Sequence, residues 1–297
     1  MKWHGVMPAI TTPFAPNLTI DHEFLRQHAS WLVDHGCTGV VALGSLGEGA
    51  TLRLEEKLAV LASCHQALAG RAPLVAGIAA LSTAEAVELA RAAESAGSEG
   101  LMVLPPYVYR GDWQETAAHF RAVIAATPLS CMLYNNPIAY GVDVTPEQLA
   151  ELAAVLPNLH AVKESSADVR RVSAIRSLLA ERLAILVGVD DLIVEGIAAG
   201  ATGWIAGLVN ALPRESLQLF ELALAGRHQE ARRLYDWFLP LLRLDTVPKF
   251  VQLIKLVQQA VGMGSERVRP PRLPLEGTER ETALRLIQNT LRGRPAA

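Results

Sequence analysis

The sequence contains few lysines, few cysteines and few aromatic residues. Only five of its 27 basic residues are lysines, at positions Lys2, Lys57, Lys163, Lys249 and Lys255. The three cysteines, Cys37, Cys64 and Cys131, are an odd number without paired spacing, which favours free thiols in a reducing compartment over a disulfide framework. Because arginine is otherwise so strongly preferred, each lysine is a candidate for a specific task.

Long apolar runs and blocks of one charge are also missing. No apolar stretch reaches the roughly 18 residues that a membrane helix needs. The first residues lack a long apolar core followed by a small-residue cleavage site, so no signal peptide is predicted. The net charge is −3 and the pI is about 6.3, with no basic patch for nucleic acid or an anionic membrane. We therefore expect a cytoplasmic protein that binds neither nucleic acid nor membranes.

Eight short apolar runs alternate with longer stretches rich in alanine, leucine, glutamate and arginine. Most runs are continuously apolar, which indicates strands that are covered on both faces, as in parallel sheets. Eight successive strand–helix units predict an α/β fold, a closed (β/α)8 TIM barrel, with an open doubly wound sheet as the alternative. The runs cover residues 7–14, 38–44, 73–78, 100–105, 130–135, 160–164, 184–188 and 202–207.

Helix-start signals and a change of pattern define the organisation of the chain. Ser82 and Thr145 are placed to cap helices, the second with Pro146 in its first turn. Strand-like runs stop after residue 212, and the rest of the sequence has the pattern of helices. We expect residues 1–212 to form the barrel catalytic domain, and residues 213–297 to form its last helix and a C-terminal helical extension.

A glycine-rich loop, GSLGEG at residues 44–49, follows the second apolar run. No lysine follows these glycines as in a P-loop, and their spacing is not the G-x-G-x-x-G of dinucleotide-binding proteins. Glu48 would repel phosphate. The loop is therefore predicted to bring backbone N–H groups and the Ser45 hydroxyl to a small carboxylate.

Three polar residues lie where barrel enzymes place their active sites, at the carboxyl ends of the strands: Ser45, Tyr134 and Lys163. Partial burial of Lys163 would favour its neutral amine, which attacks carbonyls and forms Schiff bases. The alternative is an ion pair with Glu164 or Asp190. The Tyr134 hydroxyl could shuttle protons or simply face water. Ser45, taken alone, could be only a turn residue.

Taken together, these segments resemble the dihydrodipicolinate synthase / N-acetylneuraminate lyase family of class I lyases. The resemblance covers almost the whole chain, and six motifs occur in the order of the family. They are PAITTPF at 8–14, GSLGE at 44–48, YNNP at 134–137, VKESS at 162–166, GVDD at 188–191, and the C-terminal segment at 247–275 that ends in RLPL.

The resemblance implies a mechanism. Lys163 would form a Schiff base with the 2-oxo group of pyruvate or a related 2-oxo acid, and Tyr134 would be the proton shuttle. The loop at Ser45, Leu46 and Gly47 would hold the substrate carboxylate. The iminium formed at Lys163 would act as an electron sink for cleavage, elimination or condensation at C3.

The resemblance also implies the remaining parts of the site and the assembly. Gly188 and Ile205 would line the pocket, and Asp190 and Asp191 fall where sialic acid lyases bind sugar hydroxyls. A helix-capping or solvated role is the alternative for both aspartates. The family needs no metal or organic cofactor, and the scattered histidines give no support for a metal site. Its members imply a homo-oligomer, a dimer or a tetramer.

Three positions depart from the dihydrodipicolinate synthase pattern. Ala139 replaces the arginine that binds the second substrate's carboxylate, and Leu46 replaces a second loop hydroxyl. Val108 replaces the tyrosine that this family contributes across a subunit interface, with Tyr109 as a possible substitute. These changes argue against the lysine-biosynthesis reaction and make Leu46 and Ala139 walls for a small substrate.

The leading interpretation is a class I lyase that acts on a small hydroxylated 2-oxo acid or its cyclic imine. The reaction would be deamination or dehydration, as in 1-pyrroline-4-hydroxy-2-carboxylate deaminase, or aldol cleavage of a 2-keto-3-deoxy sugar acid that releases pyruvate. Residues 210–215 resemble the hydroxyproline-pathway members. One alternative is 4-hydroxy-tetrahydrodipicolinate synthase, which joins pyruvate and aspartate semialdehyde. An alternative of another class is a non-catalytic 2-oxo acid sensor.

Overall fold

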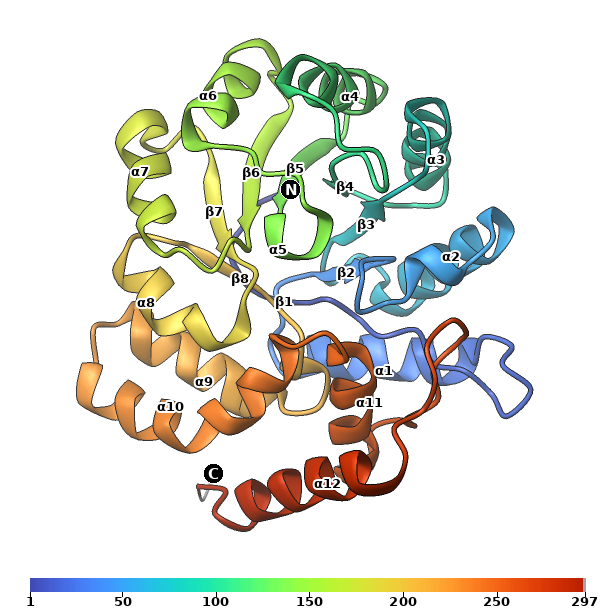
Figure 1. Cartoon of the computed structure of the whole chain (residues 1–297), viewed down its shortest axis with the longest axis vertical. Coiled ribbons are helices and arrows are strands. Elements are labelled where there is room, and N and C mark those ends of the chain that lie inside the picture. Colours follow the sequence, from blue (N-terminus) through green and yellow to red (C-terminus); the bar gives the residue numbers. More distant parts are fainter. Residues whose placement is uncertain (296–297) are drawn as a thin grey trace.

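The computed structural model describes residues 1–295 and has the shape of a barrel ringed by helices (Figure 1). Eight parallel strands form one sheet in the order β1-β8-β7-β6-β5-β4-β3-β2, and a parallel bridge between Ala9 and Val41 joins its two edges. The predicted (β/α)8 barrel is confirmed. The strands are β1 (Gly5–Pro8), β2 (Val40–Ala42), β3 (Leu74–Ile78), β4 (Gly100–Val103), β5 (Ser130–Asn135), β6 (Leu159–Glu164), β7 (Ala184–Val187) and β8 (Gly203–Ala206).

The helices surround the sheet and continue beyond it at the C-terminus (Figure 1). Their bounds are α1 (His22–Asp34), α2 (Leu54–Leu68), α3 (Thr83–Ser95), α4 (Trp113–Ala125), α5 (Pro137–Tyr140), α6 (Pro146–Val155), α7 (Arg170–Leu179), α8 (Ile193–Ala198), α9 (Pro213–Leu224), α10 (His228–Leu242), α11 (Phe250–Ala260) and α12 (Gly277–Arg292). No helix in the described part of the chain is long and apolar enough to cross a membrane.

The predicted helix caps form. The Ser82 hydroxyl accepts a hydrogen bond from the backbone N–H of Glu85 at 3.2 Å and so begins α3. At the start of α6 the backbone N–H of Gln148 donates to the Thr145 hydroxyl, and the backbone N–H of Thr145 donates to the Gln148 side chain. Pro146 occupies the first turn of this helix. Each cap satisfies N–H groups that the first helical turn leaves without partners.

The first strand differs from the prediction. It was expected at residues 7–14 and instead ends at Pro8. The two threonines that follow turn to other partners: Thr11 Oγ1 donates to Gln258 Oε1 at 2.9 Å, and Thr12 Oγ1 donates to the carbonyl of Gly47 at 2.6 Å. These bonds lead the chain away from the sheet and towards the loop after β2 and α11.

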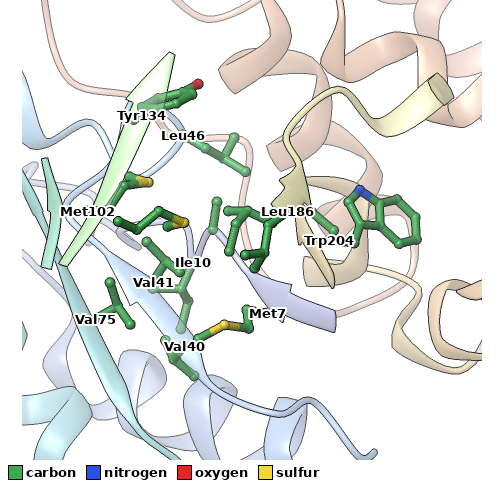
Figure 2. Close-up of a cluster of buried hydrophobic side chains, with 14 of the residues drawn as sticks. Met7, Ile10, Val40, Val41, Leu46, Val75, Met102, Tyr134, Leu186 and Trp204 are labelled. Atoms are coloured by element: carbon green, nitrogen blue, oxygen red, sulfur yellow. The ribbon is translucent and has the colours of Figure 1, made fainter. Parts of the chain in front are cut away.

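The barrel interior is filled with apolar side chains. Figure 2 shows Met7 and Val40 towards one end of this cluster, and Leu46 and Tyr134 at the other. All four are at most 5% exposed. Close packing of this kind makes a barrel a rigid support for groups at its mouth.

The segment after residue 212 forms α9 to α12 in the described part of the chain, as predicted; residues 296 and 297 of the predicted extension lie outside the described residues. Helix α11 returns to the barrel and packs against the turn η3 (Leu208–Asn210) that follows β8. The extension therefore lies against the end of the barrel where the strands terminate.

Candidate active site

Lys163 and Tyr134 are direct neighbours at the ends of two adjacent strands. Their Cα atoms are partners in the register of β6 and β5. The Lys163 Nζ atom lies 4.1 Å from the centroid of the Tyr134 ring. Both residues are almost completely buried, with exposed fractions of 6% and 5%. The two candidate catalytic residues are thus brought together by strand pairing.

Lys163 forms no ion pair with Glu164 or Asp190, the two carboxylates that were considered as its partners from the sequence. Within residues 1–295, no carboxylate oxygen lies within 4 Å of its amine. Glu164 instead accepts hydrogen bonds from Asn135 Nδ2 at 3.1 Å and from the backbone N–H of Ser166 at 2.6 Å. Burial raises the pKa of the Glu164 carboxyl, and these bonds oppose that rise. The Lys163 amine is left free of strong protein partners.

Tyr140, which the sequence analysis did not select, connects the loop after β2 to Tyr134. It ends the short helix α5, and its hydroxyl is hydrogen-bonded to that of Ser45. Its ring stands edge-on to Tyr134 with centroids 5.7 Å apart. Burial, and then the proximity of Tyr134, raise the pKa of Tyr140 well above its ordinary value. In the sequence, Tyr140 was marked only by its position directly after Ala139, a predicted residue of the substrate site.

Tyr134 has a second polar neighbour within its own motif. Asn136 Nδ2 donates to the Tyr134 hydroxyl oxygen at 3.0 Å, while Asn136 Oδ1 caps α5 by accepting from Ala139 N–H. The segment YNNP therefore orients its own tyrosine and begins the helix that carries Tyr140. A buried tyrosine hydroxyl that accepts a bond keeps its proton available for donation.

The glycine-rich loop is held by close backbone contacts. A Cβ atom at Gly47 would lie 2.9 Å from the carbonyl oxygen of Ile10, and one at Gly49 would lie 2.1 Å from that of Leu43. Leu46 is 3% exposed, so its side chain belongs to the barrel interior, whereas Ser45 is half-buried. These glycines permit an approach that any side chain would block.

The two aspartates after β7 differ from each other in their surroundings. Asp190 has no exposed surface, and its carboxylate accepts from Trp204 Nε1 at 2.9 Å and from the N–H groups of Gly207 and Leu208 at 3.1 and 2.8 Å. Burial raises its pKa to about 6, and those donors oppose the rise. The Asp191 carboxylate is 22% exposed and faces Arg243 at 3.6 Å.

The remaining predicted residues lie around this end of the barrel. A Cβ atom at Gly188 would be 2.4 Å from Lys163 Cε, which places Gly188 against the lysine. Ile205 is a fully buried residue of β8, and Ala139 is exposed on α5. Val108 is 70% exposed. The structure thus brings Ser45, Tyr134, Lys163 and Gly188 together, while Ala139 and Val108 lie nearer the surface.

One hollow on the surface lies away from Lys163. It has a volume of about 270 Å³ and lies at the starts of α3 and α4, where it is lined by residues such as Ser82, Thr83 and Tyr109. Lys163 does not line it. Within residues 1–295, no three His, Cys, Asp or Glu side chains are grouped as metal ligands. The candidate site is assigned from the strand ends.

The fold and these strand-end residues define an enzyme of the barrel-lyase class. A sequence profile described as the Dihydrodipicolinate synthetase family matches residues 2–290. The chain belongs to this family, whose members are lyases of the aldolase type that work through a Schiff base.

Individual relatives agree with the profile. The 4-hydroxy-tetrahydrodipicolinate synthase of Methanothrix thermoacetophila is 33% identical over 287 residues, which cover 95% of each chain. The 4-hydroxy-tetrahydrodipicolinate synthase of Methylacidiphilum fumariolicum SolV superposes with a TM-score of 0.92 at 30% identity and covers 98% of both chains. The dihydrodipicolinate synthase of Acinetobacter baumannii, complexed with pyruvate, has a TM-score of 0.91 at 28% identity and covers 97% of this chain and 98% of its own.

These relatives bear on the two interpretations of the sequence. They confirm the lyase class and the family resemblance. Their names agree with the alternative, 4-hydroxy-tetrahydrodipicolinate synthase, better than with the leading interpretation of a lyase for hydroxylated 2-oxo acids.

Proposed function

We propose that Lys163 is the Schiff-base lysine of this lyase and that Tyr134 moves the protons during its formation. One observation carries the proposal: a buried lysine amine, without a carboxylate partner in residues 1–295, lies 4.1 Å from the centre of a buried tyrosine ring at the carboxyl ends of neighbouring strands. A lysine amine that is held beside a proton-transferring hydroxyl, with no carboxylate bonded to it, is placed to attack a carbonyl carbon.

The chemistry follows from these two groups. The neutral amine adds to the carbonyl carbon of a 2-oxo acid, and the resulting carbinolamine loses water to give an iminium. Tyr134 gives a proton to the departing hydroxyl and can recover one from the amine. The iminium draws electrons from C3, so that a bond to C3 can form or break. The family's lyase activity requires this step.

The substrate carboxylate is assigned to the loop after β2. The Ser45 hydroxyl and the N–H groups of Leu46 and Gly47 lie at a strand end, and Tyr140 supplies a further hydroxyl bonded to Ser45. Backbone N–H groups in a turn form anion-binding concavities. In this assignment Gly188 and Ile205 are walls of the site, and Asp190 and Asp191 shape it from the side of β7 and β8.

For the substrate, we favour a small hydroxylated 2-oxo acid or its cyclic imine. The support is chemical: an exposed Ala139 offers no cation for a second carboxylate, and Leu46 offers no second loop hydroxyl. The second candidate is 4-hydroxy-tetrahydrodipicolinate synthase, which joins pyruvate to aspartate semialdehyde; the names of the relatives favour it.

The Schiff base is tested by borohydride reduction in the presence of pyruvate, followed by intact-mass and peptide mass spectrometry. We expect one reduced adduct on Lys163 and none in Lys163→Ala. Lys57→Ala, which removes a half-buried lysine of α2, is the matched control and should be labelled like the wild type. A folded protein with no adduct, or with an adduct on another lysine, would end the proposal.

The reaction is tested by comparing substrates with the same preparation. Ammonia release from 1-pyrroline-4-hydroxy-2-carboxylate and pyruvate release from 2-keto-3-deoxy sugar acids report on the favoured activity. Consumption of aspartate semialdehyde with pyruvate reports on the second candidate. Adduct formation without turnover of any of these substrates would instead support a 2-oxo acid sensor.

We also propose that the protein is a homo-oligomer. Leu81 and Tyr109, which are 71% and 57% exposed, line one hollow, and Leu81 lines a second hollow with Leu54. Large apolar side chains gathered at the surface are typical of protein–protein contacts. Light scattering should give a dimer or tetramer, and Leu81→Asp should shift it towards the monomer.

A further inference from the structure

Asp245 comes from the C-terminal extension but lies at the end of a barrel strand. It closes the short turn η4 (Arg243–Asp245), which follows α10 and packs against η2 (Asp190–Leu192) after β7. A Cβ atom at Gly207 would lie 2.1 Å from Asp245 Oδ1. The carboxyl group therefore rests on the backbone directly after β8, and only glycine at position 207 leaves room for it.

The carboxyl groups of Asp245 and Asp190 are neighbours, but they differ in their hydrogen-bond partners. Asp190 accepts three N–H groups, whereas in the described part of the chain Asp245 has no hydrogen-bond donor and no cation within bonding distance. Burial, and then the charge of Asp190, raise the pKa of Asp245 well above its usual range, and Lys163 opposes this rise. Asp245 thus lies near enough to Asp190 and Lys163 for the charges of both to act on it.

A second polar group beside Lys163 also lacks a partner. The Ser165 hydroxyl is 1% exposed and forms no hydrogen bond among the described residues. A Cβ atom at Gly188 would meet both Ser165 Oγ, at 2.0 Å, and Lys163 Cε, at 2.4 Å, so the hydroxyl and the lysine lie against the same glycine. Buried polar groups are nearly always paired, so the unpaired Ser165 hydroxyl beside the lysine points to a ligand with polar atoms of its own.

We propose that Asp245 hydrogen-bonds a hydroxyl group of the substrate while the substrate's 2-oxo carbon is bound to Lys163. This assignment rests on the proposed function and adds a specificity residue from the C-terminal extension. A carboxyl group accepts a hydrogen bond from a hydroxyl group when it is ionised, and it can also donate one when it is protonated. An unsubstituted 2-oxo acid offers Asp245 no hydroxyl partner, so the carboxyl group would add little to its binding.

The test uses two ligands that differ by one hydroxyl group, 4-hydroxy-2-oxopentanoate and 2-oxopentanoate. For each, the concentration that gives half-maximal borohydride trapping on Lys163 is measured by intact mass, counting every Lys163 adduct. The wild type should trap the hydroxylated acid at the lower concentration. Asp245→Ala should weaken trapping of the hydroxylated acid by roughly 10- to 100-fold and leave 2-oxopentanoate nearly unchanged.

Three further variants separate binding from folding. Asp245→Asn keeps a donor and an acceptor and should restore part of the preference. Gly207→Ala displaces the carboxyl group without removing it and should reproduce the selective loss. Asp236→Asn, a surface carboxylate of α10 paired with Arg232, should behave like the wild type.

The outcomes distinguish this inference from the function on which it rests. No trapping of pyruvate by the wild type defeats the proposed function itself. Pyruvate trapping without any preference for the hydroxylated acid, or a loss in Asp245→Ala that is equal for both acids, overturns the role of Asp245 alone. Selective loss with partial recovery in Asp245→Asn supports it.

Discussion

Lys255 on α11 and Glu48 in the loop after β2 form an ion pair in the interior of the protein. The Nζ–Oε1 distance is 2.5 Å, and the side chains are 2% and 0% exposed. Lys255 also donates to the carbonyls of Thr12 and Arg267 at 2.8 and 2.7 Å. The C-terminal extension is therefore bonded to the loop that carries Ser45, three residues before Glu48.

This pair should be essential for stability. Burial lowers the pKa of Lys255 and Glu48 opposes that change, so the ammonium depends on its carboxylate. Lys255→Met removes the nearest cation of the buried Glu48 carboxylate, which keeps the Arg269 N–H at 2.9 Å and the Arg272 guanidinium at 3.9 Å, and we expect it to lower the free energy of unfolding by about 3–5 kcal/mol. The double variant Glu48→Gln/Lys255→Met should recover part of this loss. Denaturant titration measures both, and a loss below about 1 kcal/mol in the single variant would contradict the expectation.

Tyr134→Phe should lower kcat by roughly 10²- to 10⁴-fold, the range expected for one proton-transfer group. The ring remains beside Lys163, so the substrate should still bind and KM should change much less than kcat. Steady-state kinetics gives both values, with whichever substrate the comparison of candidate substrates shows to be turned over. An unchanged kcat would mean that another hydroxyl, such as that of Tyr140, moves the proton.

Gly188→Ala should impair the lysine more than the fold. The new methyl group would lie 2.4 Å from Lys163 Cε and 2.0 Å from Ser165 Oγ, so the lysine side chain must move. We expect the rate of borohydride trapping to fall at least about tenfold, for a loss of stability of roughly 1–3 kcal/mol. At Gly293 the added methyl group would make only ordinary contacts, at 3.7 Å or more. Gly293→Ala is therefore the control, and equal effects in both variants would count against the assignment.

His28 should make stability depend on pH. Its side chain has no exposed surface, Nε2 contacts the Asn210 carbonyl at 2.9 Å, and burial lowers its pKa from 6.5 to about 4. The unfolded chain therefore binds the proton first as the pH falls. The contribution of neutral His28 is present above pH 6.5 and is lost as the pH falls towards 4.

That loss amounts to about 3 kcal/mol for this separation of pKa values. It should appear as a narrowing of the stability difference between the wild type and His28→Gln, because other titrating groups affect both proteins alike. Urea denaturation at pH 7.5, 6, 5 and 4.5 gives the difference. A difference that is independent of pH would contradict the burial of a neutral imidazole.

The sequence by itself determined the barrel and which residues lie together at the carboxyl ends of its strands. A chain of eight strand–helix units has few arrangements other than a sheet that closes into a barrel. Residues at the carboxyl ends of the strands then lie together at one end of that barrel. That is why Lys163 and Tyr134, 29 residues apart, were found as partners; their Cα atoms are paired in the register of β5 and β6. Local features such as the Ser82 helix cap depend on only a few neighbouring residues, so the sequence also predicted them.

Only the tertiary structure decided what the distant parts of the chain do at this mouth. The sequence predicted only that Glu48 would repel phosphate. In the structure Glu48 is turned inward and accepts a hydrogen bond from Lys255, 207 positions away. Asp245 gave no signal, because nothing in its own segment shows that η4 will fold back onto Gly207. Contacts between distant residues have no period and no local propensity, and the packing of the whole chain is the physical cause that creates them.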